Sequence, residues 1–247
     1  MIFSRKKQAE YIFDVHCHIT PGVDDGSQSL EETLKMLAIA KNEGITHMLA
    51  TPHFKINHRN ASPQKVNELL KKVKAAAKEI GINISIYQGN EVMYYGEMCE
   101  ALNEGRISTM NNTDYVLIEF MPTDSFRYIR NALDDVAGEG YQPVLAHVER
   151  YGCMVDDIEN VRELKRLGVK IQTNASSITG SIGKNIKKFT HQLLKEQLID
   201  YIGTDSHRCE GSRTPLMKEC AALMYKKYDE EYVNDVLYRN AMNDFFE

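Results

Sequence analysis

The chain lacks several features that would assign it to a membrane, extracellular or nucleic-acid-binding class. None of its apolar runs approaches the roughly 20 residues of a membrane-spanning helix. Its five cysteines are scattered and include no Cys-x-x-Cys pair, which argues against a disulfide scaffold and favours a reducing cytoplasm. The basic N-terminus has no apolar segment of the kind a signal peptide needs. The net charge of −5 indicates no basic surface for nucleic acid.

Three catalytic signatures are also absent. No cysteine is followed six residues later by arginine, so the Cys-x5-Arg phosphate loop is excluded. No Gly-x-Gly-x-x-Gly follows the first predicted strand, which disfavours an open, doubly wound sheet, although that fold remains the structural alternative. A lysine at a strand end, as expected for a metal-dependent amidohydrolase, is not evident.

Short apolar runs alternate with amphipathic segments throughout the 247 residues, which are enough for a sizeable core. Seven runs rich in Ile, Val, Leu or Tyr predict buried parallel strands, at 12–16, 46–51, 83–88, 115–120, 143–147, 169–173 and 201–204. No linker or low-complexity stretch separates them. The pattern therefore predicts an α/β fold, a single (β/α) barrel over residues 11–247, after a polar N-terminal extension at 1–10.

Helix signals fill the intervals between these strands. Ser29 and Glu32 form a predicted capping box, and Gly44 marks the end of that helix. Ser62-Pro63 provides an N-cap and a first helical residue, with Gly81 as the stop. Further helices are predicted at 156–167, 186–197, 215–227 and 231–246.

Imidazoles and carboxylates recur where the predicted strands end. They are His16, His18, Asp25, His53, Glu91, Glu119, His147, Asp205 and His207. Functional residues of parallel α/β folds collect at this end of the strands. One such histidine alone is more often structural, but five of the eight histidines lie there; we expect the other three, His47, His58 and His191, to be surface or packing residues.

Nine nitrogen and oxygen ligands are too many for one ion, so the sequence predicts two or three divalent metals bridged by a carboxylate. Mixed imidazole and carboxylate ligation suits Zn, Mn or Fe better than Mg or Ca. A buried Glu119 at the end of an apolar strand is costly unless it is paired or metal-bound. Cys17, between two ligands on one strand, is expected to face the other side and pack.

These residues stand in motifs that resemble a known superfamily. The motifs are Asp14-Val-His-Cys-His with the following Thr-Pro-Gly-Val-Asp-Asp-Gly, Ala50-Thr-Pro-His53, Gly89-Asn-Glu91, Leu117-Ile-Glu119, Ala146-His-Val-Glu-Arg150 and Gly203-Thr-Asp-Ser-His207. From about Phe13 to about Pro215 the chain resembles the PHP (polymerase and histidinol phosphatase) superfamily. Within it, the chain is similar to the bacterial manganese-dependent tyrosine-protein phosphatases of capsule and exopolysaccharide operons. The resemblance implies a distorted (β/α)7 barrel.

The resemblance also implies three metal positions. His16, His18, Glu91 and Asp205 would hold the first; Glu91 as a bridge, Glu119 and His147 the second; and Asp25, His53 and His207 the third. The family register favours Asp25 over the neighbouring Asp24. A carboxylate at Glu119 favours the tyrosine phosphatase branch, since related histidinol phosphatases often have histidine there.

The activity implied by the resemblance is hydrolysis of phosphotyrosine, especially on a bacterial tyrosine autokinase. Metals, Mn most of all and otherwise Fe or Zn, would bind the phosphate oxygens and activate water. Arg150, and less strongly Arg213, would bind the phosphate, and we predict Arg150, Asp25 and Glu119 as catalytic residues. Asp25 or a metal-bound water would protonate the leaving tyrosinate.

Three other functions are alternatives to a tyrosine phosphatase. A histidinol-phosphate or other small-molecule phosphatase would need the same ligands, so this alternative stays open. A nuclease would want a basic groove, which the acidic composition disfavours. A non-catalytic domain would be expected to lose ligands, whereas all nine positions are filled. Residues 54–60 and Tyr94-Tyr95 are candidates to line the approach to the metals, or simply to pack.

Overall fold

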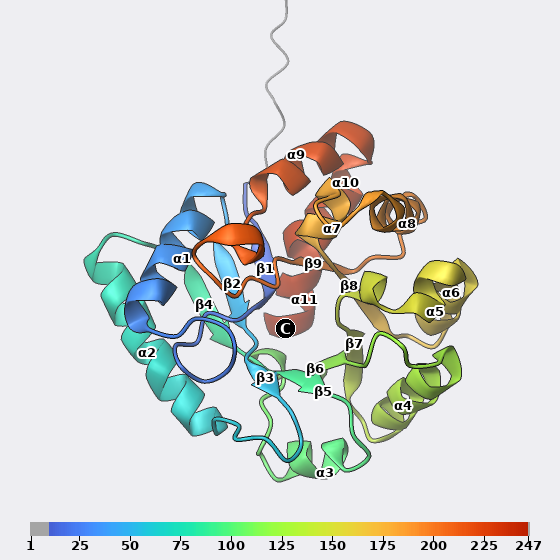
Figure 1. Ribbon diagram of the computed structural model, residues 1–247, viewed down its shortest axis with the longest axis horizontal. Coiled ribbons are helices and arrows are strands. Elements are labelled where there is room, and N and C mark those ends of the chain that lie inside the picture. Colours follow the sequence, from blue (N-terminus) through green and yellow to red (C-terminus); the bar gives the residue numbers. More distant parts are fainter. Residues whose placement is uncertain (1–9, 247) are drawn as a thin grey trace, which may run out of the picture.

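Short parallel strands curl around a common axis and are surrounded by helices (Figure 1). The structure is a computed structural model that describes residues 10–246; the rest of the predicted N-terminal extension, residues 1–9, lies outside the described residues. The strands are β1 (Phe13–Cys17), β2 (His47–Ala50), β3 (His53–Phe54), β4 (Ser85–Gln88), β5 (Glu91–Met93), β6 (Tyr115–Glu119), β7 (Gln142–Leu145), β8 (Lys170–Asn174) and β9 (Tyr201–Gly203).

Two of the seven predicted strands, 46–51 and 83–88, correspond to β2 and β4, and each is followed after a break by a short strand that was not predicted, β3 and β5. Pro52 lacks an N–H group and lies in the break between β2 and β3. Gly89 and Asn90 separate β4 from β5. The hydrogen bonds Gly89 N to Ala50 O (2.9 Å) and Glu91 N to Pro52 O (3.2 Å) keep the two broken strands side by side. The barrel therefore has the seven strand positions that the sequence predicted, although β3 and β5 are too short to be recognised separately.

The barrel closes between its last strand and its first. The sheet order is β1-β2-β4 in one ladder and β3-β5-β6-β7-β8-β9 in the other. Asp205 N donates to His16 O (2.7 Å) and His18 N donates to Ser206 O (2.9 Å), so the segment after β9 pairs with β1. These bonds confirm the predicted barrel and place the two ends of the predicted metal-ligand set next to each other.

The helices form an outer ring in Figure 1. They are α1 (Leu30–Asn42), α2 (Pro63–Glu79), α3 (Met98–Asn103), α4 (Phe126–Gly138), α5 (Gly152–Asp156), α6 (Ile158–Arg166), α7 (Ala175–Thr179), α8 (Lys184–Lys195), α9 (Lys218–Lys227), α10 (Glu230–Asn234) and α11 (Asn240–Phe246). Among the described residues, none of these helices combines the length and the apolar character needed to cross a membrane.

The predicted caps of α1 and α2 are largely confirmed. Ser29 Oγ accepts a hydrogen bond from Glu32 N, and Ser62 Oγ accepts one from Lys65 N. The Glu32 carboxylate, however, accepts from Gln28 N (2.8 Å) rather than from the N-cap residue. The capping box is therefore shifted by one residue, and it still satisfies two backbone donors at the helix start.

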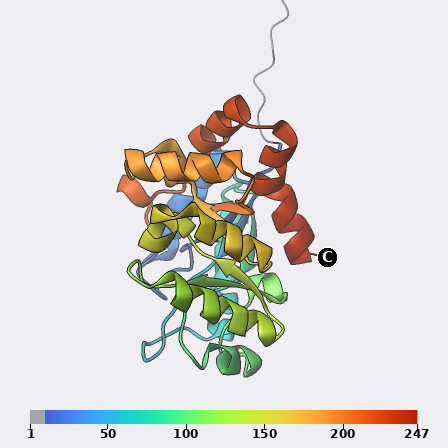
Figure 2. The ribbon, with the colours of Figure 1, turned by 90° about the vertical axis from the view of Figure 1, so that its right-hand side faces the viewer.

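The predicted helix at 231–246 is interrupted. A π-helical turn, Asp235–Arg239, lies between α10 and α11. Val236, Leu237, Ala241 and Phe245 are all buried, and Figure 2 shows α11 standing along one side of the barrel. Phe245 packs edge-on against Phe13, at the start of β1. The last helix therefore covers the amino-terminal end of the strands, opposite the predicted site.

Other differences concern helix ends and short helices. Helix α9 begins at Lys218, three residues after the predicted start at Pro215. Helices α3, α4, α5 and α7 were not predicted. Helix α4 has a clear apolar face in the sequence, made of Ile129, Ala132, Leu133 and Val136, all of which are buried. The helical spacing of these apolar residues could therefore have predicted α4 from the sequence.

Candidate metal centre

The nine predicted ligands gather at the end of the barrel where the carboxyl ends of β1, β2, β4, β6, β7 and β9 lie. His16 is on β1 and His18 follows it; His53 opens β3 and Glu91 opens β5; Glu119 ends β6; His147 follows β7; Asp205 and His207 follow β9. Asp25 comes from the loop after β1 and is the exception in exposure, at 61% of its side chain. Closure of the barrel, together with the strand breaks at Pro52 and Gly89-Asn90, brings these side chains to one point.

Glu91 occupies the middle of this cluster. Its Oε2 lies 3.2 Å from Nε2 of both His16 and His18 and 3.0 Å from His53 Nδ1. Its Oε1 lies 2.8 Å from His147 Nε2. The two carboxylate oxygens thus face different imidazoles, as a carboxylate that bridges two ions must.

Two further carboxylates flank Glu91. Glu119 Oε1 lies 3.1 Å from His53 Nδ1, and Glu119 Oε2 lies 3.8 Å from His147 Nε2. Asp205 Oδ1 lies 3.7 Å from His16 Nε2 and 3.5 Å from His18 Nε2. These carboxylates therefore enclose the histidines from opposite sides.

Asp25 belongs to the outer part of the cluster. Its Oδ1 lies 3.4 Å from His53 Nε2 and 3.6 Å from His207 Nε2. Because most of its side chain is exposed, Asp25 is the ligand candidate that solvent and an incoming substrate reach most easily.

The donor atoms gather into three overlapping groups. These are His16-His18-Glu91, His53-Glu91-Glu119 and His18-Asp25-His53-His207, each with its donor atoms within 4.8 Å of one another. The grouping also comprises three sets but differs from the implied ones. The implied ligands His147 and Asp205 belong to none of the three, and His18 and His53 each take part in two groups. Each of these two rings has both nitrogens facing acidic groups.

Unsatisfied polar atoms show that the residues fit metal ions. His53 Nδ1, Glu91 Oε2, Glu119 Oε1 and His207 Nε2 are buried and lack a hydrogen-bond partner. Leaving such atoms unpaired costs about 1–3 kcal/mol each. Four of them converge here, and a divalent cation is the partner that would satisfy both imidazole and carboxylate donors.

The charge state of the cluster follows from its crowding. Burial opposes ionisation of Glu91, but the adjacent His16 and His147 hold its pKa well below the usual range. Burial likewise opposes protonation of His18 and His53, yet the carboxylates beside them raise their pKa values to about 9 and about 10. In the metal-free protein, protons on these two rings take the place of metal charge.

His207 behaves in the opposite way. Burial and the neighbouring His18 lower the pKa of His207 to about 3. His207 is therefore neutral over the physiological range, the form that ligates metal.

A supporting residue explains the choice between Asp24 and Asp25. Asp24 Oδ2 accepts hydrogen bonds from His18 Nδ1 (2.8 Å) and from His53 N (3.0 Å). Burial opposes its ionisation, but the bond from His18 holds the pKa of Asp24 at about 2. Asp24 thus orients His18 from behind and leaves His18 Nε2 facing the cluster, while Asp25 faces His53 and His207 directly.

A second supporting residue, Gln172 on β8, was not predicted. Its Oε1 accepts from His147 N (2.6 Å) and faces His16 Nδ1 at 3.2 Å. His16 is thereby turned with Nε2 toward Glu91. The available signal was an amide within a predicted strand, because an amide that becomes buried there needs partners.

The backbone is unusual at two ligands. His147 has φ 32° and Asp205 has φ 51°, both in the left-handed region that residues other than glycine rarely adopt. Such conformations cluster at functional sites, where the surrounding structure holds them. At His147, the bond from its N–H to Gln172 is part of that restraint.

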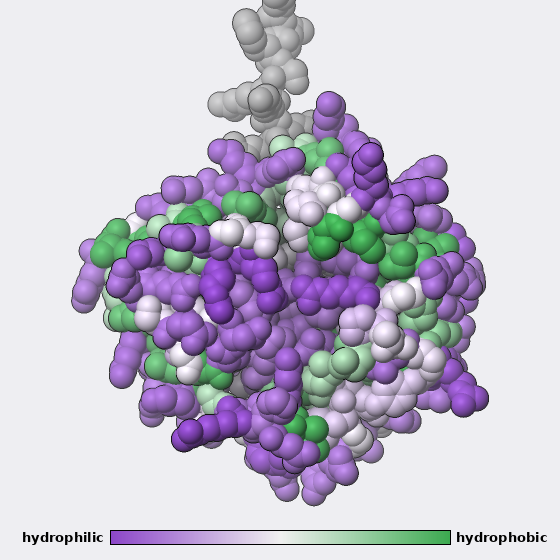
Figure 3. All heavy atoms as spheres, viewed as in Figure 1, coloured by the Kyte–Doolittle hydropathy of each residue, from purple (hydrophilic) through white to green (hydrophobic). Residues whose placement is uncertain are grey.

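Both predicted phosphate-binding arginines reach the edge of the cluster. Arg150 Nη2 forms an ion pair with Asp205 Oδ2, and Arg213 Nη2 lies 3.1 Å from Asp205 Oδ1. The two arginines line a cavity of about 260 Å³ with Asn174, Ser176, Ser181, Ile182, Thr204, Asp205 and Ser212. Figure 3 shows hydrophilic residues across the centre of this face.

The remaining predicted residues lie elsewhere. Tyr94 stacks on Phe120 and Tyr95 stacks on Phe54, and both tyrosines line a separate cavity of about 420 Å³ beside α4. They are not among the described residues that line the cavity between the arginines. Cys17 is buried and its thiol donates to Leu49 O, so its predicted packing role is confirmed.

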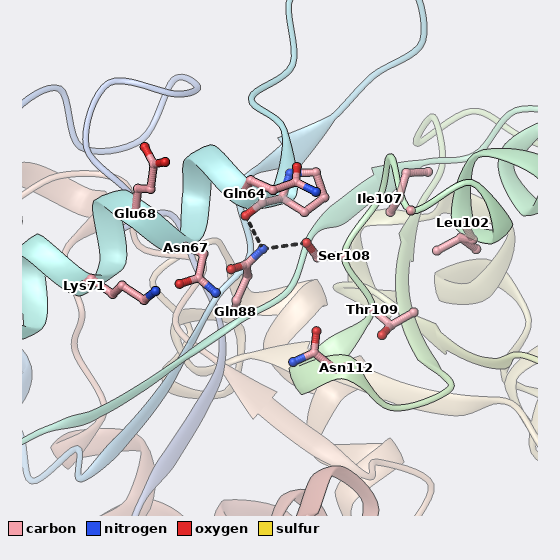
Figure 4. Close-up of a pocket in the computed structure, with 12 residues that line it drawn as sticks. Gln64, Asn67, Glu68, Lys71, Gln88, Leu102, Ile107, Ser108, Thr109 and Asn112 are labelled. Atoms are coloured by element: carbon pink, nitrogen blue, oxygen red, sulfur yellow. Dashed lines mark hydrogen bonds between the residues drawn. The ribbon is translucent and has the colours of Figure 1, made fainter.

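A larger cavity, of about 600 Å³, is not part of the metal centre. It lies between the start of α2 and residues 102–112, where Gln88 Nε2 donates to Pro63 O and Ser108 Oγ (Figure 4). Its lining includes none of the nine candidate ligands. The cavity of about 260 Å³, which Arg150, Asp205 and Arg213 line, is therefore the candidate substrate site.

Fold and site together define a parallel (β/α) barrel with a candidate metal centre of imidazoles and carboxylates at the carboxyl ends of its strands. The family model described as "Capsular polysaccharide synthesis, CpsB/CapC" matches residues 12–245. The chain belongs to this CpsB/CapC family.

Comparison with individual proteins agrees with this assignment. The tyrosine-protein phosphatase CpsB of Streptococcus pneumoniae is 30% identical over 93% of this chain and 96% of its own. A solved structure described as one of the metal-dependent tyrosine phosphatases YwqE from Bacillus subtilis and CpsB from S. pneumoniae superposes with a TM-score of 0.88 at 28% identity, covering 95% of this chain and 94% of that one.

A histidinol phosphate phosphatase provides a more distant comparison. The Lactococcus lactis enzyme, in complex with zinc, L-histidinol and phosphate, has a TM-score of 0.58 at 16% identity, with 88% of this chain and 94% of that one covered. At this identity the likeness establishes the shared fold alone.

Proposed function

We propose that this protein is a metal-dependent tyrosine phosphatase, acting in the cytoplasm on a bacterial tyrosine autokinase that controls capsule or exopolysaccharide synthesis. The observation that carries the proposal is the cluster of imidazole and carboxylate side chains next to two arginines that line one cavity. Membership of the CpsB/CapC family and the names of the tyrosine phosphatase relatives support the choice of substrate. The five free cysteines are consistent with a reducing compartment.

The residues divide into ligands and substrate-binding groups. His16, His18, Glu91 and Asp205 would hold one ion, Glu91, Glu119 and His147 a second, and Asp25, His53 and His207 a third, with Mn²⁺ as the proposed metal. When bound, these ions supply Lewis acidity toward the phosphate and activate water. Their donor set equally permits Fe or Zn.

Arg150 and Arg213 would bind the phosphate oxygens. A guanidinium group offers paired donors that match two oxygens of a phosphate. Both arginines now pair with Asp205, so they are held at the edge of the centre before a phosphate arrives. Charge that develops on the phosphate oxygens during hydrolysis would be stabilised by these fixed donors.

Asp25 is the residue we propose for protonating the leaving tyrosinate. It is the most exposed of the nine ligands and lies between His53 and His207 at the mouth of the centre. The phenol has an ordinary pKa near about 10, so its departure needs only modest help.

A small-molecule phosphatase of the histidinol phosphate type is the second candidate. Such an enzyme would use the same metal ligands, which keeps it a candidate. Glu119, at a position where related histidinol phosphatases often have histidine, favours the tyrosine phosphatase branch.

The test is hydrolysis of a phosphotyrosine peptide and of histidinol phosphate by the purified protein, with Mn²⁺ and after chelation. We expect Mn²⁺-dependent release of phosphate from the peptide. His147→Ala should remove it, since this ring contacts Glu91 and faces Glu119. His58→Ala, at an exposed histidine outside the centre, is the matched control and should retain activity.

A clear preference for histidinol phosphate would instead assign the protein to the small-molecule branch. Absence of metal-dependent turnover on both substrates would reject the phosphatase function itself, whatever metal the centre binds.

A further inference from the structure

One hydrocarbon side chain borders the cavity between the arginines. Among the described residues that line it, Ile182 alone is aliphatic; the others are Arg, Asn, Asp, Ser and Thr. Ile182 is 51% exposed in the free protein. An isoleucine left this open beside a polar cavity retains apolar surface that a ligand can cover.

The turn that carries Ile182 is well defined. It links α7 to α8 and is flanked by Gly180 (φ 95°) and Gly183 (φ 127°). Ser181 N donates to Ser176 O (3.0 Å) and Gly183 N donates to Gly180 O (3.2 Å). Lys187 Nζ donates to Thr179 O (2.7 Å) and ties the turn to α8. The backbone that presents Ile182 is therefore hydrogen-bonded on both sides.

The floor of the cavity is shared with the metal centre. Asp205 lines the cavity, and its Oδ1 faces His16 and His18 while its Oδ2 pairs with Arg150. A phosphate gripped by Arg150 and Arg213 at the edge of the centre therefore has the cavity immediately beside it. The group esterified to that phosphate is placed within reach of the cavity wall.

We infer that Ile182 is a specificity-determining residue that packs against the aromatic ring of the phosphorylated side chain. This inference rests on the proposed phosphatase function and extends it to the leaving group. The guanidinium planes of Arg150 and Arg213 offer a second surface for a π-system. An aliphatic wall and cationic planes around a phosphate site favour an aryl ester over an alkyl ester of similar size.

Another exposed aliphatic residue, Leu216, provides a control substitution for Ile182. Leu216, in the segment after β9, is 54% exposed but does not line the cavity. It matches Ile182 in size, hydrocarbon character and exposure. Hydrophobic residues also gather over α7, at the border of the hydrophilic centre in Figure 3.

The experiment compares binding of phenylphosphonate and methylphosphonate to the full-length Mn²⁺-loaded protein by calorimetry. Both are non-hydrolysable and carry the same phosphonate group, so the ratio of their affinities measures the contribution of the phenyl ring to binding. We expect wild type to prefer phenylphosphonate, and Ile182→Ala to lower that preference by about 3–10-fold while leaving methylphosphonate unchanged. Ile182→Leu should restore most of the preference, and Leu216→Ala should leave it intact.

An unchanged preference in Ile182→Ala, or an equal loss for both phosphonates, overturns the inference. Wild-type binding of neither phosphonate overturns both the inference and the proposed phosphate site. Ring-dependent binding through Ile182 in a protein that hydrolyses no phosphomonoester would sustain the inference and reject the proposed activity, so the two failures are distinguishable.

Discussion

At the scale of single residues, His16 and His18 each depend on the partner of their second ring nitrogen. Asp24 holds Nδ1 of His18, and Gln172 faces Nδ1 of His16. Such partners fix the tautomer and orientation of a metal-binding imidazole. The sequence motif provides the histidines, while these contacts determine which nitrogen is offered to the metal.

Substitution of Asp24 tests this dependence. Asp24→Asn keeps the shape but removes the charge that His18 and the backbone of His53 contact. We expect Mn²⁺ affinity to fall by about 10–100-fold with the fold retained. A fluorescence or calorimetric metal titration measures the change, with circular dichroism as the check on folding. Asp156→Asn, at an exposed carboxylate, should behave as wild type; equal affinity in both variants would contradict the role of Asp24.

Arg150 is held at the edge of the centre by its ion pair with Asp205. Burial opposes the charge on Arg150, but the nearby Asp205 raises its pKa further, so the guanidinium stays cationic. Arg150→Ala should lower kcat for a phosphotyrosine peptide by about 10²–10³-fold, because a fixed donor to the developing phosphate charge is lost. Steady-state kinetics measures the effect, with Arg127→Ala, an exposed arginine on α4, as the control. A change in KM alone would assign Arg150 to substrate binding without transition-state stabilisation.

At the scale of elements, the close approach of β9 to β1 depends on a glycine, Gly203. A Cβ at Gly203 would lie 2.6 Å from His16 Cβ and 3.0 Å from Gln172 Nε2. The strands that carry His16 and Asp205 can pair this closely because Gly203 has no side chain.

Gly203→Ala should therefore destabilise the fold by about 1–3 kcal/mol through overpacking and weaken metal binding as His16 shifts. Gly138→Ala is the matched control, since no atom lies within 4 Å of its added Cβ and it ends α4. In Gly138→Ala the free energy of unfolding should stay unchanged or rise by about 0.5–1 kcal/mol, because alanine has the higher helix propensity. Urea unfolding of both variants decides; equal stability of the two would show that β1 and β9 separate freely.

At the scale of the whole molecule, metal and protons compete for the centre. The pKa values of His18 and His53 are raised to about 9 and about 10, because the effect of the neighbouring carboxylates outweighs that of burial. Below those values the metal-free rings hold protons that a metal must displace. Mn²⁺ affinity should therefore rise with pH across the neutral range, by up to about tenfold per pH unit for each displaced proton.

Calorimetry in buffers of different ionisation enthalpy measures the released protons directly. The same binding stabilises the native state, so chelation should lower Tm, and added Mn²⁺ should restore it. Affinity that is independent of pH, with no proton release, would contradict the charge state derived for the two histidines.

The sequence by itself determined the strand positions, the barrel and the nine polar residues at the strand ends. It did so because buried parallel strands read as apolar runs, and because costly buried imidazoles and carboxylates stand out at their ends. His16, His53, His147 and His207 were recognisable on that basis alone. The supporting partners were less visible, since Gln172 and Asp24 act through contacts with residues far along the chain or around a loop.

Tertiary structure alone decided how those residues meet. Only closure of β9 onto β1 places Asp205 beside His16 and His18, across nearly the whole length of the chain. Only the strand breaks at Pro52 and Gly89 turn His53 and Glu91 toward each other. Ile182 carries no local signal for function either. Its place beside Arg150 and Arg213 arises because residues after three different strands converge at one end of a closed barrel, a long-range consequence that local sequence pattern does not encode.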